Sequence, residues 1–197
     1  MKLLCKVVPY PDETLAGYFL RLAQINHYSS AKMIIDIAGL QSKTRAFKLN
    51  LFYTYKDDFS KLCEITGLSE NILWSMAFCK KYNYQNGIEG FGEVFSSALL
   101  NHGYFSICPA CLQEKYYYRQ IWDLNHVRVC PFHKCYLIKA CPKCHQKINM
   151  SFSQLSQCKN CRFFSTIGLS VPPYLIFCYP VIFIINLITL KYIQYSV

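Results

Sequence analysis

Acidic residues are scarce in this chain of 197 residues, which carries 11 Asp and Glu against 21 Lys and Arg, a formal net charge of +10. Charged residues of both signs make up only 16% of the sequence, whereas hydrophobic residues make up 53%. A chain with so little charge and so much apolar surface is not intrinsically disordered. Its length suits one ordinary domain or two small ones.

The usual arrangements of catalytic residues are also missing from the sequence. We find no paired carboxylates and no nucleophile beside a candidate base. The glycine-bearing stretch "NYQNGIEGFGEVFSS" at 83–97 has no Lys-Ser/Thr after its glycines, so it is a connector and not a phosphate-binding loop. The sequence therefore predicts a protein that is not an enzyme.

The start of the chain does not have the pattern of a leader peptide, so we expect no export. The opening "MKLLCKVVPYPDETL" meets Pro9, Pro11 and two acids before an apolar stretch of useful length forms. Without export, thiols stay reduced in the cytoplasm. Of the 12 cysteines, eight lie from Cys108 to Cys161. This clustering indicates metal ligands rather than disulfides.

The first hundred residues show helical periodicity. Apolar residues from Leu15 to Ile25 lie on one helical stripe, and "AKMIIDIA" at 31–38 follows as a second helix that ends at Gly39. Another helical pair at about 59–78 turns at Gly67. We predict a helix-turn-helix-like helical domain over 1–100. Because "LSENILWSMAF" at 68–78 contains no Lys or Arg, we favour a packed scaffold here over a helix that reads DNA.

The cysteines and one histidine from residue 108 onward form pairs in which two residues separate the ligands. The first two pairs have 18 residues between them and the last two have 13. Such spacing is typical of zinc knuckles, each of which supplies two of the four ligands of a tetrahedral site. We predict two zinc ions, held by Cys108, Cys111, Cys130 and His133 and by Cys141, Cys144, Cys158 and Cys161.

The spacing leaves the pairing of the knuckles open, since a consecutive and a cross-braced arrangement both satisfy it. Cys135, His126 and His145 are substitute ligands in either arrangement, although surface or core roles are favoured for them. Both quartets are complete, and only Glu114 and Asp123 supply acids between 101 and 170. A catalytic zinc keeps one position open for water. The predicted sites are therefore structural.

The positive charge is concentrated in the same segment. Residues 101–170 carry nine basic and two acidic residues, whereas residues 1–100 carry 11 and nine. Seven ligand thiolates and two zinc ions lower the +7 of this segment to about +4. Basic and aromatic residues on a zinc platform can contact phosphates and stack on bases. The candidate nucleic-acid-binding residues are Lys115, Arg119, Arg128, Lys134, Lys139, Lys143 and Lys147.

Two stretches of the sequence resemble the TniQ family of bacterial transposition proteins. They are "PYPDETLAGYFLRLAQINHYSS" at 9–30 and "CPACLQEKYYYRQIWDLNHVRVCPFHKCYLIKACPKCHQ" at 108–146. The resemblance spans about residues 7–165. Its most specific parts are P-x-E-T-L, C-P-x-C-L, the run with Tyr118, Arg119 and Trp122, and V-C-P-x-H-x3-L-x3-C-P-x-C.

The resemblance implies an adaptor in DNA transposition. TniQ-like proteins connect a target-recognising factor, either a CRISPR effector or a DNA site bound directly, to the AAA+ regulator of the transposase. It also implies a cytoplasmic, nucleoid-associated protein of a bacterium. A homodimer is compatible with this role. The alternatives are a stand-alone zinc-dependent DNA-binding regulator and, less favoured, a membrane-tethered zinc protein.

The last residues depart from the family pattern. The stretch at 174–190 is largely apolar but is interrupted by Pro180 and Asn186, whereas a membrane helix needs about 20 apolar residues. Three interpretations remain: a truncated or frame-shifted end, a buried helix and a membrane anchor. We thus expect a mainly α fold of three parts: the helical domain at 1–100, two tandem zinc-finger or zinc-ribbon-like units at 101–168, and a hydrophobic tail at 169–197.

Overall fold

The computed structural model describes residues 3–40, 51–53, 57–81, 83, 85–101, 105–148, 158, 160 and 161. The apolar tail expected at 169–197 lies outside these residues. In the described part of the chain, no helix combines the length and the apolar character that a membrane crossing requires.

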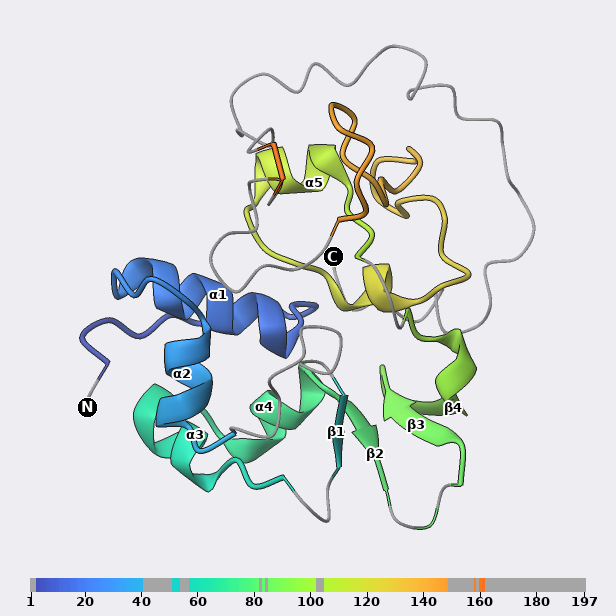
Figure 1. Ribbon diagram of the computed structural model, residues 1–197. Coiled ribbons are helices and arrows are strands. Elements are labelled where there is room, and N and C mark those ends of the chain that lie inside the picture. Colours follow the sequence, from blue (N-terminus) through green and yellow to red (C-terminus); the bar gives the residue numbers. More distant parts are fainter. Residues whose placement is uncertain are drawn as a thin grey trace.

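The expectation of a mainly α fold is wrong, because the described residues include a four-stranded mixed sheet (Figure 1). The strands are β1 (Leu51–Tyr53), β2 (Phe78–Lys80), β3 (Gly87–Gly90) and β4 (Glu93–Ser96), in the order β1-β2-β3-β4. β1 and β2 are parallel, and the other two pairs are antiparallel. Five short α-helices accompany them within the described residues: α1 (Leu15–Ile25), α2 (Lys32–Ile37), α3 (Ser60–Thr66), α4 (Glu70–Ser75) and α5 (Pro109–Glu114). Two 3-10 turns, η3 (Ser97–Leu99) and η4 (Gln120–Asp123), complete the elements.

The stretch expected to be a glycine-bearing connector is the β3–β4 hairpin. Phe91 and Gly92 form its two-residue turn with φ of +56° and +74°, the pattern of a type I′ turn. A Cβ atom on Gly90 would lie 2.6 Å from Cδ1 of Phe78. A glycine is therefore required there so that β3 can pass beneath the Phe78 ring.

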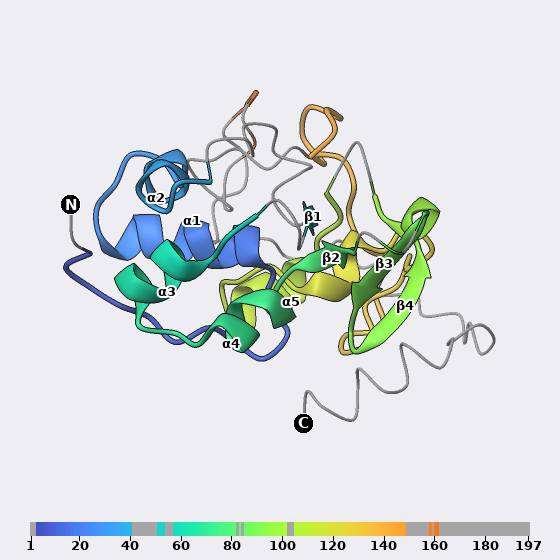
Figure 2. The same ribbon diagram turned by 90° about the horizontal axis from the view of Figure 1, so that it is seen from below.

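The helices of the N-terminal region follow the predicted pattern. α1 coincides with the apolar stripe, and its N-cap Thr14 accepts a hydrogen bond from the backbone N–H of Gly17. α3 ends at Gly67, whose φ of +76° gives the left-handed C-cap that glycine adopts most readily. Figure 2 shows α1 to α4 gathered at one end of the molecule and β3 and β4 at the other.

One continuous buried core joins the residues on either side of position 100. Backbone bridges link Glu13 to Arg119 and Leu100 to Leu124, and the N–H of Thr14 donates to the carbonyl of Tyr118 at 2.9 Å. Trp122 is fully buried. The cysteine-rich segment is thereby fastened directly to the start of α1.

Candidate metal centres

The first group of candidate ligands is assembled by α5 and by a tight turn. Cys108 is the N-cap of α5, and its Sγ accepts from the backbone N–H of Cys111 at 3.5 Å. Pro109 occupies the first helical position, where its missing N–H has no cost. Cys130 and His133 face them from a turn that Lys134 closes in the left-handed conformation, with φ of +55°.

The ligand atoms of Cys108, Cys111, Cys130 and His133 all lie within 4.8 Å of one another. The Sγ atoms of Cys111 and Cys130 are 3.6 Å apart, and Nδ1 of His133 lies 3.2 Å from Sγ of Cys111 and 3.6 Å from Sγ of Cys108. Metal–sulfur bonds of about 2.3 Å in a tetrahedron place sulfurs roughly 3.7 Å apart, whereas a disulfide requires about 2.05 Å. The spacing fits a shared metal ion.

A carboxylate orients the histidine of this group. Nε2 of His133 lies 2.9 Å from Oε1 of Glu114, and Glu114 is the last residue of α5. A proton on Nε2 leaves the lone pair of Nδ1 directed at the three sulfurs. Carboxylate partners of this kind fix the tautomer of metal-bound histidines. In addition, hydrogen bonds from the thiols of Cys108 and Cys111 lower the pKa of Cys130, whereas hydrogen bonds with Cys111 and Cys130 raise the pKa of Cys108.

The second group consists of Cys141, Cys144, Cys158 and Cys161, whose sulfurs also lie within 4.8 Å of one another. The sulfur of Cys141 is 3.6 Å from that of Cys161, and the sulfur of Cys144 is 3.5 Å from that of Cys158. Cys141 is buried and the other three are partly exposed. The structure thus groups the ligands as consecutive quartets.

The two turns that begin at Cys130 and Cys141 have the same hydrogen bonds. Four positions after the first cysteine lie Lys134 and His145, with left-handed φ of +55° and +57°. Lys134 donates its N–H to the carbonyl of Cys130 at 2.9 Å, and His145 donates its N–H to the carbonyl of Cys141 at 2.8 Å. The first cysteine in turn donates its N–H to the carbonyl of Cys135 or Gln146, at 2.8 Å in both. A repeated C-P-x-[HC] sequence produces a repeated knuckle.

These geometries define what each group can do chemically. Each can hold one metal ion with four protein ligands, which would leave no coordination position for a substrate or a water. Of the three substitute ligands, only Cys135 contacts a donor group, with its Sγ 3.5 Å from that of Cys108. His145 is exposed, and the ring nitrogens of His126 have no hydrogen-bond partner among the described residues.

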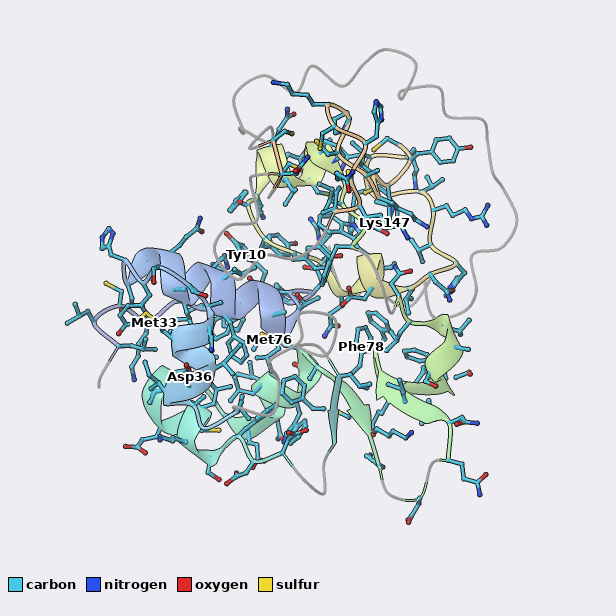
Figure 3. All side chains as sticks on the ribbon, in the orientation of Figure 1. Tyr10, Met33, Asp36, Met76, Phe78 and Lys147 are labelled. Carbon is cyan, nitrogen blue, oxygen red and sulfur yellow. The ribbon has the colours of Figure 1, made fainter. Side chains whose placement is uncertain are left out.

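The predicted nucleic-acid-binding residues are placed unevenly. Lys115, Arg128, Lys134, Lys143 and Lys147 are exposed, and Lys139 is half-buried (Figure 3 labels Lys147 among the loops of the cysteine-rich segment). Arg119 differs from them: it is 9% exposed and pairs with Asp12. Its charge is therefore paired inside the protein and does not lie on the surface.

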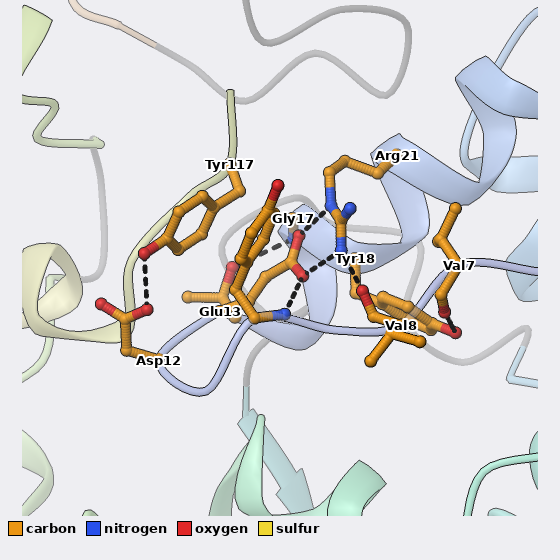
Figure 4. A network of polar contacts seen from close by, with 10 residues as sticks. Val7, Val8, Asp12, Glu13, Gly17, Tyr18, Arg21 and Tyr117 are labelled. Atoms are coloured by element: carbon orange, nitrogen blue, oxygen red, sulfur yellow. Dashed lines mark hydrogen bonds and ion pairs between the residues drawn. The ribbon is translucent and has the colours of Figure 1, made fainter. Parts of the chain in front are cut away.

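Sequence reasoning missed the polar network around Asp12 and Glu13 (Figure 4). Tyr117 donates its hydroxyl to Asp12 at 2.7 Å, and Arg21 donates to both carboxylate oxygens of Glu13 at 2.6 and 2.7 Å. The P-x-E-T-L opening places these acids in front of α1. The sequence did contain a signal for this network, because acidic residues such as Asp12 and Glu13 within an apolar segment suggest that each has a buried partner.

Five side chains of this network form one column of rings and cations. The guanidinium of Arg21 lies 4.6 Å from the ring centre of Tyr10, which stacks on Tyr117 at 4.2 Å. The guanidinium of Arg119 lies between Tyr117, at 4.7 Å, and Phe132, at 4.2 Å. In the sequence, Phe132 lies between the ligands Cys130 and His133, so the column runs from α1 to the first donor group.

Comparison with known proteins places this arrangement in a family. The TniQ family model matches residues 4–137, which contain the P-x-E-T-L opening, the column and the first donor group. The chain belongs to the TniQ family. The resemblance seen in the sequence is thereby confirmed, and the protein is associated with transposition. No curated protein matches this TniQ chain. The second donor group lies beyond the matched residues.

Proposed function

We propose that this TniQ protein is a zinc-binding adaptor of DNA transposition that connects a target-recognising factor to the AAA+ regulator of the transposase. The family match over residues 4–137 is the observation that carries the proposal. The two complete donor sets support it, because they can stabilise small loops and leave no position for catalysis. The target factor is a CRISPR effector or a DNA site.

Zinc is the metal that these ligands suit best. Three thiolates with one imidazole, and four thiolates, are the common donor sets of structural zinc, and tetrahedral geometry with soft ligands selects against magnesium and calcium. Each ion contributes on the order of 10 kcal/mol to folding when its ligands are brought together from an unfolded chain. Zinc thus holds residues 105–148 in a shape that a partner can recognise.

The adaptor proposal is tested by association with the AAA+ regulator encoded in the same mobile element. The tagged full-length chain is expected to retain that regulator during co-purification. A Cys111→Ser/Cys135→Ser variant, which has too few thiols left to complete the first centre, is expected to retain less. An Asp36→Asn variant is the matched control, since Asp36 is exposed on α2 and far in sequence from every ligand. If resin without the tagged chain recovers as much regulator as resin that carries the chain, the proposal is refuted.

A stand-alone DNA-binding regulator is the second candidate, favoured by the exposed basic residues at 115, 128, 134, 143 and 147. Contacts with phosphates make affinity fall steeply as salt concentration rises. We expect a Lys143→Gln/Lys147→Gln variant to bind duplex DNA more weakly and with a shallower salt dependence. Binding by the wild-type chain that is absent or insensitive to salt would exclude this candidate.

A further inference from the structure

Cys135 has a position that the two donor groups do not explain. Among the cysteines described between 105 and 148, Cys135 alone belongs to neither group. Its side chain is only 8% exposed, and its Sγ lies 3.5 Å from Sγ of Cys108. This separation is close to the edge of a zinc–thiolate tetrahedron, about 3.7 Å.

The turn itself does not require a thiol at position 135. Only the backbone carbonyl of Cys135 takes part, as the acceptor for the N–H of Cys130. In the second knuckle the same role falls to the carbonyl of Gln146, whose side chain has no thiol. The sulfur of Cys135 is therefore additional to what the local fold needs.

His133 and Cys135 both lie beside Cys108 but differ in their exposure to solvent. The side chain of His133 is 21% exposed and rests on Glu114, which is 65% exposed. Cys135 lies on the buried side, against Cys108. Rotation of a cysteine about χ1 between staggered positions moves its sulfur by roughly 3 Å. A movement of that size is comparable with the edge of the ligand tetrahedron, about 3.7 Å.

We propose that Cys135 is an alternative ligand of the first centre, able to replace His133 and complete a four-sulfur set with Cys108, Cys111 and Cys130. This inference rests on the proposed metal binding. The exchange replaces a neutral imidazole by a thiolate, so the charge of the metal-bound group becomes more negative by one. It also releases His133 and Glu114 toward solvent while the metal stays bound.

The test uses the full chain loaded with Co²⁺, which shows thiolate-to-metal charge-transfer absorption that grows with the number of metal–sulfur bonds. Metal content is measured in parallel by elemental analysis. The variants are His133→Ala, Cys135→Ser and the double variant, and His133→Asn is added because it keeps most of the ring's volume. The second centre, with four sulfurs, is the internal reference in every variant.

We expect two metal ions in the wild type, in Cys135→Ser and in both His133 variants, and one in the double variant. The charge-transfer absorbance per chain should rise by about one-seventh in the His133 variants, because eight metal–sulfur bonds replace seven. Loss of one metal from both His133 variants would overturn the inference. Retention of two metals by the double variant would overturn it as well. A wild-type chain that binds a single metal, and loses it in a Cys144→Ser variant, would instead refute the first centre itself.

Discussion

The ion pair between Asp12 and Arg119 gives the sharpest prediction about stability. Asp12 is 4% exposed and Arg119 is 9% exposed, and the guanidinium is also enclosed by Tyr117 and Phe132. Asp12→Asn removes the negative charge and leaves the guanidinium buried without its counterion. Removing one partner of a buried pair typically costs about 3–5 kcal/mol. This is a large part of the roughly 5–15 kcal/mol that stabilises an ordinary domain.

The loss can be measured by urea unfolding of the metal-loaded chain, followed by the fluorescence of its two tryptophans, Trp74, which is half-buried, and Trp122, which is fully buried. With a slope of about 2 kcal/mol per molar urea, a loss of about 4 kcal/mol lowers the midpoint by about 2 M. The exposed control Asp36→Asn is expected to change stability by less than about 0.5 kcal/mol.

A double variant, Asp12→Asn/Arg119→Met, separates the charge from the packing. Because it removes both charges, it is expected to be more stable than Asp12→Asn alone. If Asp12→Asn shifts the midpoint by no more than Asp36→Asn does, the pair has no role in stability and the reasoning is refuted. The same conclusion follows if the double variant is less stable than the single one.

Three further predictions concern the hairpin and the two centres. Gly90→Ala forces a Cβ against Phe78 and should lower stability by about 1–3 kcal/mol. Gly92→Asn should cost less, because position 92 is in open space and asparagine tolerates its left-handed φ. Equal melting temperatures for the two variants would contradict this. Glu114→Ala should weaken metal retention at the first centre about 10–100-fold in chelator competition and leave the second unchanged; equal weakening of both would show that the carboxylate has no specific role. The backbone N–H of Gln146 helps to lower the pKa of Cys144 to about 6, and burial raises that of Cys79 to about 12. Since the thiolate is the reactive form, Cys79 should stay unalkylated at neutral pH in the folded, metal-loaded chain, and Cys144 should react only after a chelator removes the metal from the second centre; rapid alkylation of Cys79 in the loaded chain, mapped by mass spectrometry, would contradict this.

The sequence was most informative where residue spacing alone determines geometry. The pairs of ligands separated by two residues predicted both donor groups, because a two-residue interval forces two ligands onto one tight turn. The apolar stripe from Leu15 to Ile25 likewise predicted α1. In both cases a local pattern fixes the local structure.

The sheet was missed because its strands are short and depend on distant partners. β1 has three residues and pairs with β2. The paired residues Leu51 and Phe78 lie 27 positions apart in the sequence. Gly87 and Gly90 weaken the strand signal of β3, yet Gly90 is needed beneath Phe78. Packing between distant segments determines these strands, and the local periodicity of a sequence gives no information about such packing.

Arg119 illustrates the same limit for the candidate site. As one of several basic residues in an aromatic segment, it has the composition of a nucleic-acid contact. Its partner Asp12 lies 107 positions earlier in the chain. Only the docking of the P-x-E-T-L opening against the Tyr117–Arg119 segment brings the two together.

The most direct test of two independent structural zinc centres is the zinc content of the purified chain and of two variants. Cys111→Ser/Cys135→Ser removes a ligand of the first group together with the neighbouring substitute thiol, and Cys144→Ser removes a ligand of the second. The account predicts two zinc ions per wild-type chain and one in each variant. One zinc or none in the wild type, or the loss of both ions from either variant, would contradict it.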